Sequence, residues 1–233
     1  MQSACAKVGR PMDAVALMAV SKGQPPDAIA AAVRAGVTLF GESKVQEAKA
    51  KISLCPASAH WTMIGHLQSN KCRDAVFFFE GIHSVDSLKL AQELNKWADK
   101  RGKTIPILIE VNVAGEASKD GYVPGSLQRE LAELNRLRRL ELHGLMTVPP
   151  WSPDPERSRG TFRQLRQLKE ECEQILGAPM PQLSMGMSGD FEVGIEEGAT
   201  MVRLGTILFG PRRSSRDVSA KPREGTAGEA EHI

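Results

Sequence analysis

The sequence of 233 residues contains no long apolar run and only four cysteines. No stretch approaches the roughly 18 consecutive apolar residues of a membrane span, and Met1–Arg10 is too short and polar for a signal peptide. The cysteines form no Cys-x-x-Cys pair, which argues against a zinc site or a disulfide framework; they are Cys5, Cys55, Cys72 and Cys172. We therefore expect a cytoplasmic protein with no membrane segment and no metal.

An excess of charge of one sign is also lacking. Thirty Lys and Arg residues against 28 Asp and Glu residues leave a formal net charge of +2. This bias is too small for the phosphate-neutralising surface on which nucleic-acid binders rely, so nucleic acid is not the expected partner. The composition, 41% hydrophobic and 25% charged, is that of a globular protein with one sizeable core.

Eight apolar runs rich in Val, Ile and Leu recur along the chain, with helix-like segments between them. This alternation is typical of parallel strands covered by helices. Because eight strand–helix units in about 200 residues can close into a barrel, we predict an α/β fold with a single (β/α)₈ TIM-type barrel over residues 1–210. The predicted strands are Val15–Ser21, Thr38–Gly41, Trp61–Gly65, Gly81–Val85, Ile105–Val113, Leu140–Val148, Gln182–Met187 and Met201–Phe209.

The segments between these runs carry helix signals. Apolar residues recur with helical spacing from Leu88 to Ala98, after Asp86 or Ser87 as the N-cap. A left-handed glycine is predicted to close three of the helices, at Gly36, Gly102 and Gly177.

The last third of the chain carries its most charged segments. Pro149–Pro155 predicts a loop before a long helix, Glu156–Leu176. Its basic residues are diluted by glutamates and are interpreted as a solvated helix face; they are Arg157, Arg159, Arg163, Arg166 and Lys169. Residues 211–233 are almost without apolar side chains and are predicted to be a disordered polar tail.

Lys22 is the first candidate functional residue. In a barrel of this kind the active face lies at the carboxyl ends of the strands, and Lys22 directly follows the first apolar run. Apolar neighbours disfavour the charged ammonium, and the neutral amine is the form that makes a Schiff base. A solvated lysine at a strand end is the alternative, and this position alone leaves it open.

A second group of candidates follows the seventh run and lies in the eighth. Ser184–Gly189 and Gly205–Thr206 contain small residues whose backbone N–H groups and hydroxyls could approach a phosphate. Tight turns between strand and helix are the alternative. Arg203 lies inside an otherwise apolar strand, where a guanidinium needs a partner, either an ion pair in the barrel or a ligand's ring nitrogen.

An ordered series of motifs then resembles a known family. These motifs include Ala19-Val20-Ser21-Lys22, Phe40-Gly41-Glu42, Ile64-Gly65-His66-Leu67-Gln68-Ser69, Ser184-Met185-Gly186-Met187-Ser188 and Arg203-Leu204-Gly205-Thr206. From about Val15 to Gly210 the chain resembles the pyridoxal phosphate homeostasis protein family, the stand-alone relatives of the alanine racemase barrel.

The resemblance implies a role for each candidate residue. Lys22 would hold pyridoxal 5′-phosphate as a Schiff base, and Arg203 would face the pyridine nitrogen. The phosphate would lie against Ser184, Gly205 and Thr206, with Ser188 as a further candidate, while Met146 and the Ile64–His66 segment would line the pocket. One departure concerns Ser43, which stands where the family usually has an asparagine near the cofactor.

Three functions remain open. The first is a protein that buffers or delivers the cofactor within the cell, handing it to apo-enzymes, without a dedicated reaction. The second is a pyridoxal-phosphate-dependent amino-acid racemase of low activity; by family resemblance its second acid/base lies in an extra β-domain, which we expect to be missing here. The third is an enzyme that uses Lys22 on phosphorylated carbonyl substrates without a cofactor.

Two further expectations concern metals and assembly. His60 and His66 lie across a predicted strand and lack the helical i, i+4 spacing of a metal-binding pair, so no zinc site is expected. We expect a monomer or a weak dimer.

Overall fold

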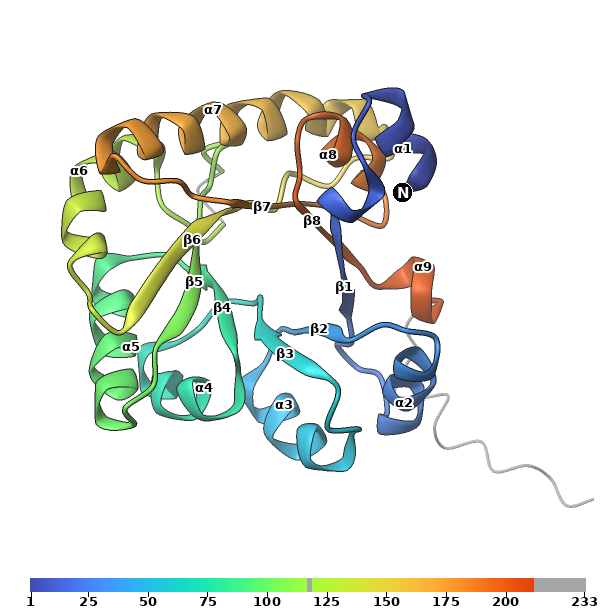
Figure 1. The fold of residues 1–233 in the computed structure, drawn as a ribbon, viewed down its shortest axis with the longest axis horizontal. Coiled ribbons are helices and arrows are strands. Elements are labelled where there is room, and N and C mark those ends of the chain that lie inside the picture. Colours follow the sequence, from blue (N-terminus) through green and yellow to red (C-terminus); the bar gives the residue numbers. More distant parts are fainter. Residues whose placement is uncertain (117–118, 212–233) are drawn as a thin grey trace, which may run out of the picture.

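Eight parallel strands close a barrel in the order β1 to β8, with β1 paired to both β2 and β8 (Figure 1). The structure is a computed structural model that describes residues 1–116 and 119–211. The strands are β1 (Ala16–Val20), β2 (Leu39–Glu42), β3 (His60–Met63), β4 (Gly81–Val85), β5 (Ile105–Glu110), β6 (Leu140–Met146), β7 (Gln182–Met187) and β8 (Met201–Leu204). The predicted barrel is confirmed, and one strand overlaps each of the eight predicted runs.

Helices follow the strands and cover the outside of the barrel (Figure 1). They are α1 (Gln2–Lys7), α2 (Pro26–Arg34), α3 (Val45–Lys51), α4 (Cys72–Phe78), α5 (Leu88–Lys100), α6 (Pro124–Asn135), α7 (Arg159–Leu176), α8 (Phe191–Glu196) and α9 (Thr206–Phe209). The predicted caps are confirmed at Ser87, whose hydroxyl accepts the Leu90 N–H, and at Gly177, which is left-handed with φ 63°. The apolar faces of the helices bury against the strands in one continuous core.

The end of the last strand was predicted wrongly. The run Met201–Phe209 is a strand only to Leu204, and Thr206–Phe209 forms α9. A continuous apolar run has no period that separates a strand from a helix, so the change at Gly205 could not be seen in the pattern. Its consequence is functional, because the backbone turns at the mouth of the barrel instead of continuing as a strand.

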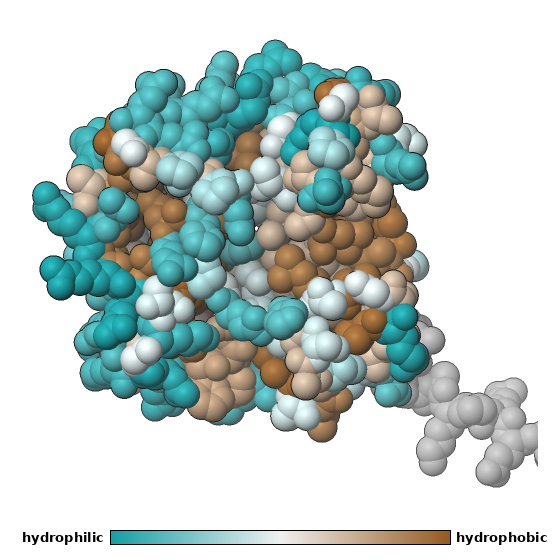
Figure 2. All heavy atoms as spheres, viewed as in Figure 1, coloured by the Kyte–Doolittle hydropathy of each residue, from teal (hydrophilic) through white to brown (hydrophobic). Residues whose placement is uncertain are grey.

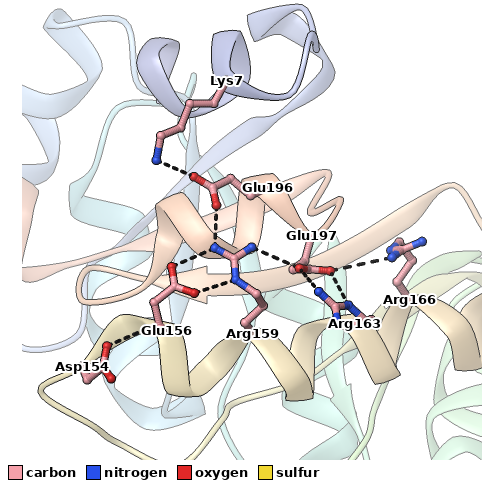
Figure 3. Close-up of polar contacts among 8 residues, drawn as sticks. All are labelled: Lys7, Asp154, Glu156, Arg159, Arg163, Arg166, Glu196 and Glu197. Atoms are coloured by element: carbon pink, nitrogen blue, oxygen red, sulfur yellow. Dashed lines mark hydrogen bonds and ion pairs between the residues drawn. The ribbon is translucent and has the colours of Figure 1, made fainter.

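The basic face of α7 is a helix–helix contact. Arg159 contacts Glu196 at 2.6 Å and Glu197 at 3.1 Å, and Arg163 and Arg166 also contact Glu197, which is buried (Figure 3). These arginines remain partly in contact with solvent, as predicted, with the Arg163 side chain 53% exposed, but they also pair with glutamates that the sequence did not indicate. The glutamates that bind them lie on and just after α8, so these ion pairs form where α8 packs beside α7.

The surface divides into polar and apolar regions. Hydrophilic side chains cover α7 along the upper edge of the view, while apolar residues gather at the right, near α9 (Figure 2). Within the described residues, no helix combines the length and the hydropathy needed to cross a membrane. The predicted polar tail lies outside the described residues, apart from Pro211, so its disorder stays a prediction.

Candidate functional site

A cavity of about 700 Å³ opens at the carboxyl ends of β1, β2, β3, β6, β7 and β8. This volume is in the usual range for sites that bind small molecules and cofactors. Six of the nine predicted site residues line the cavity, although they come from opposite ends of the chain: Lys22, Ser43, Ser188, Arg203, Gly205 and Thr206. Closure of β1 against β8 brings them together, with Met18 opposite Arg203 in the register.

Arg203 is almost completely buried on β8. Its guanidinium donates to the Ser184 carbonyl at 2.8 Å, to the Ser184 hydroxyl at 2.7 Å and to the Thr147 carbonyl at 2.8 Å. Burial lowers the pKa of Arg203 to about 10, and the charges of Glu110 and Asp190 oppose this effect. The residue therefore stays cationic at neutral pH and presents a fixed positive charge to the cavity.

Two titratable residues near Arg203 were not identified from the sequence. Burial raises the pKa of Glu110 to about 7, with the positive charge of Arg203 acting in the opposite direction. Burial lowers the pKa of His83 to about 3, and Arg203 and His143 add to this effect. The position of Glu110 at the carboxyl end of an apolar strand was a usable signal, whereas His83 lies inside β4 with nothing in the local pattern to mark it.

The turn between β8 and α9 holds candidate phosphate donors. The N–H groups of Gly205 and Ile207 point to the Ser188 hydroxyl oxygen at 3.3 and 3.5 Å, which are long hydrogen bonds. Thr206 lies between them and is exposed. Because these hydrogen bonds are weak, an anion could replace the Ser188 hydroxyl as the acceptor at little cost in free energy. The turn therefore suits a phosphate group.

The loop that carries Ser188 is fixed from two sides. Asp190 accepts the Met187 N–H at 2.7 Å through one carboxylate oxygen and the Ser158 hydroxyl at 2.8 Å through the other. Ser158 directly precedes α7, so the loop after β7 is tied to that helix. The position of Ser188 opposite Gly205 is therefore set by the fold and does not require a ligand.

Lys22 lies half-buried in a backbone segment that is held by charged side chains. The Ser21 carbonyl accepts from the Lys51 ammonium at 2.8 Å, and the Gly23 N–H donates to Glu47. Lys51 also contacts Glu42 at 2.7 Å and Glu47 at 2.8 Å. The i, i+4 spacing of Glu47 and Lys51 was a usable local signal for their pairing. Their contacts with Glu42 and Ser21 could not be predicted from it, because these contacts join two strands and a helix.

Three predicted residues do not line the cavity. Ser184 is fully buried with its hydroxyl bound to Arg203, and Met146 is buried beside it in the β6–β7 register. His66 is exposed and lies against Asp86 at 3.2 Å and Asp120 at 3.3 Å. For these residues a direct contact with a cofactor stays a prediction.

The cluster of His66, Asp86 and Asp120 contains groups that can bind metals, within 4.8 Å of one another. The sequence did not indicate it, because the three residues follow three different strands. Exposed acidic groups often meet without a metal, so the cluster by itself assigns no ion. His60, the other histidine considered from the sequence, pairs with Glu80 at 2.9 Å.

The donor set of the cavity fits pyridoxal 5′-phosphate. Lys22 offers an amine for the aldehyde, Arg203 offers a buried cation for the ring nitrogen, and the turn at Gly205 offers N–H groups for the phosphate. A barrel with these groups at its mouth defines the alanine-racemase-like class. In agreement, the family model for the alanine racemase N-terminal domain matches residues 2–213.

The chain belongs to the pyridoxal phosphate homeostasis protein family, as its motifs predicted. The protein of that name from Aquifex aeolicus is 42% identical over 214 residues, which are 91% of this chain and 94% of the relative. The protein of that name from Escherichia coli is 38% identical over 228 residues, covering 93% and 94% of the two chains.

Solved structures agree with this assignment. PipY of Synechococcus elongatus, with pyridoxal phosphate bound, is 38% identical with a TM-score of 0.79, and the match covers 90% of this chain and 98% of PipY. The alanine racemase of Clostridium difficile is only 16% identical, with a TM-score of 0.71 over 92% of this chain and 56% of the racemase. The likeness to the racemase therefore shows the fold alone.

Proposed function

We propose that this protein binds pyridoxal 5′-phosphate in the cavity as a Schiff base with Lys22 and acts in intracellular vitamin B6 homeostasis, buffering or delivering the cofactor. One observation carries the proposal: an amine, a buried cation and a group of phosphate donors converge in a single cavity, although they lie far apart in the sequence. The names of the relatives and the ligand of PipY support the same cofactor.

Arg203 favours holding the cofactor over catalysis with it. Pyridoxal phosphate, when bound, supplies an electron sink that works best with a protonated ring nitrogen. A fixed cation facing that nitrogen disfavours its proton by like-charge repulsion. Because three hydrogen bonds hold the Arg203 guanidinium, it cannot easily move away from this position.

The cavity also offers little for a two-base racemase. Its described lining contains three titratable side chains: Lys22, Asp190 and Arg203. Lys22 is assigned to the cofactor, Arg203 cannot act as a base, and both oxygens of Asp190 already accept hydrogen bonds. The racemase alternative is therefore less well supported than a buffering or delivery role.

The partners and the setting follow from this role. Apo-enzymes that need the cofactor would be its acceptors, and the cytoplasm would be its compartment. A monomer or weak dimer, and a single barrel domain over residues 1–210, are the arrangements that we propose.

Reduction with borohydride tests the assignment of Lys22. The loaded protein should show a visible absorbance band that borohydride abolishes, and peptide mapping should find the pyridoxyl group on Lys22. Lys22→Ala should lose the band while keeping the fold, because Lys22 lies at the mouth of the barrel outside the core. The exposed Lys44, near the same cavity, provides the control variant Lys44→Ala, which should keep the band.

Two results would overturn the proposal. A pyridoxyl group found on Lys44 or Lys71 would move the site. A wild-type protein that never shows the band, but forms a reducible adduct with phosphorylated carbonyl compounds, would favour the cofactor-free enzyme.

A further inference from the structure

The two peptide groups that flank Lys22 are both tied to one charged cluster on α3. The carbonyl of Ser21 accepts a hydrogen bond from Lys51, and the N–H of Gly23 donates one to Glu47. Glu47 and Lys51 are themselves paired at 2.8 Å, one helical turn apart. The Cα atom of Lys22 therefore lies between two peptide groups that are both held by hydrogen bonds.

The cluster is buried at Lys51 and Glu42, is partly exposed at Glu47, and extends to the neighbouring strand. Lys51 is buried, and it also contacts the fully buried Glu42 at 2.7 Å. Glu42 in turn accepts the Ser21 hydroxyl at 2.6 Å. Thus Ser21 is bound through both its carbonyl and its side chain, and the carboxyl end of β1 is locked to β2 and α3.

Glu47 is a carboxylate in this arrangement. Burial by itself would raise the pKa of Glu47, but the hydrogen bonds from Lys51 and from the Gly23 N–H outweigh it, and the pKa lies below its ordinary value. A charged acceptor makes a stronger hydrogen bond to a backbone N–H than a neutral one. The hydrogen bond from the Gly23 N–H to Glu47 is therefore stronger than one to a neutral acceptor would be.

The segment needs such a tie because of its conformation. Gly23 has a φ of 74°, in the left-handed region, and glycine loses more conformational freedom on ordering than any other residue. Buried ion pairs are on average a poor source of stability, since desolvation opposes the attraction between the charges. A role in fixing geometry accounts better for a buried cluster around this particular turn.

We propose that Glu47 and Lys51 are positioning residues for Lys22: they hold the Ser21–Gly23 backbone so that the Lys22 amine points at the aldehyde of the cofactor. This inference rests on the proposed function. Orientation of a reacting group affects the formation of a covalent bond far more than it affects contacts elsewhere in a ligand. Loss of the tie should therefore slow Schiff-base formation and leave phosphate recognition at Ser188, Gly205 and Thr206 unchanged.

The test compares two ligands that share the ring and the phosphate. Pyridoxal 5′-phosphate carries the aldehyde, whereas pyridoxine 5′-phosphate cannot form a Schiff base and reports non-covalent binding alone. In Glu47→Ala we expect the visible band to form about ten-fold more slowly or worse, since small errors in orientation have effects of this size or larger. The dissociation constant for pyridoxine 5′-phosphate should stay within about two-fold of the wild-type value.

A conservative variant and a matched control separate positioning from general destabilisation. Glu47→Gln keeps an oxygen that can accept the Gly23 N–H, so it should recover most of the rate. Glu173 on α7 has the same arrangement away from the cavity, pairing with Lys169 at 2.9 Å and accepting the Met180 N–H at 2.7 Å. Glu173→Ala should leave the rate of Schiff-base formation unchanged.

Hydrogen exchange of the Gly23 amide gives a readout that does not involve the cofactor. This amide should exchange faster in Glu47→Ala than in the wild type and in Glu173→Ala. Lys51→Met provides a second variant and should show the same separation between the two ligands. Its expected stability is lower, because Glu42 is left without its cation.

The outcomes distinguish this inference from the proposed function. If the wild type forms the band on Lys22 and Glu47→Ala forms it equally fast, the positioning role is wrong while the proposed function stands. Equal losses for both ligands, or an equal loss in Glu173→Ala, would also overturn the positioning role. If the wild type forms no Schiff base on Lys22, both proposals fail.

Discussion

Thr206 provides the sharpest test of where the phosphate lies. The residue is exposed between two N–H groups whose hydrogen bonds to Ser188 are long, so a phosphate bound there, as we propose, would displace those bonds at little cost. The Thr206 hydroxyl would add one hydrogen bond to a dianion. Thr206→Val removes that donor while keeping the size and branching of the side chain.

The expected size of the effect follows from the charge on the acceptor. A hydrogen bond to a charged group contributes about 1.5–3 kcal/mol. At about 1.4 kcal/mol per factor of ten, pyridoxal 5′-phosphate should bind about 10- to 100-fold more weakly to Thr206→Val. Unphosphorylated pyridoxal should bind almost as well as it does to the wild type, because it never makes this contact.

Absorbance titration of both vitamers measures the two affinities. Thr104 is also exposed but precedes β5 at the opposite end of the barrel, so Thr104→Val controls for the substitution itself. Both variants should unfold within about 0.5 kcal/mol of the wild type, as is usual for exposed positions. Equal losses for the two vitamers in Thr206→Val would mean that the residue shapes the pocket without binding phosphate.

Three further predictions address the barrel interior. Arg203→Glu removes the donor to two buried carbonyls and should lower the free energy of unfolding, measured with denaturant, by about 3 kcal/mol or more. In variant protein that still binds the cofactor, slow transamination should become faster. An unchanged spectrum and an unchanged rate of turnover would count against Arg203 facing the ring. Gly144→Ala places a Cβ 1.8 Å from a β7 carbonyl oxygen and should lower the melting temperature sharply, whereas Gly81→Ala, with 3.6 Å to its nearest atom, should not. Burial lowers the pKa of His83 to about 3 in the folded protein, against about 6.5 in the unfolded chain. Below pH 6.5 the unfolded chain therefore binds a proton that the folded protein does not, and the free energy of unfolding falls. His83→Gln should remove about 2 kcal/mol of this fall between about pH 7 and about pH 5. The raised pKa of Glu110 acts in the opposite direction over this range, so the variant must be compared with the wild type at each pH, and parallel curves would contradict the buried, neutral state of His83.

The sequence by itself determined the class of fold and the principal candidates in the site. Eight apolar runs with helical segments between them require parallel strands under helices, since each run must be covered on its outer face. Lys22 could be placed at the mouth of the barrel because it directly follows the first run. Arg203 could be singled out because a guanidinium in an apolar strand must have a partner.

Only the tertiary structure decided which residues meet. Glu42 and Lys51 reach Ser21 only because β1, β2 and α3 become neighbours, and the α7 arginines meet Glu196 and Glu197 only because α7 and α8 pack side by side. His66 was placed in the pocket by resemblance, yet its ring lies against Asp86 and Asp120, which follow two other strands. The periodicity of the sequence indicates which face of each helix or strand is buried. It does not indicate which elements lie side by side, and these contacts depend on that arrangement.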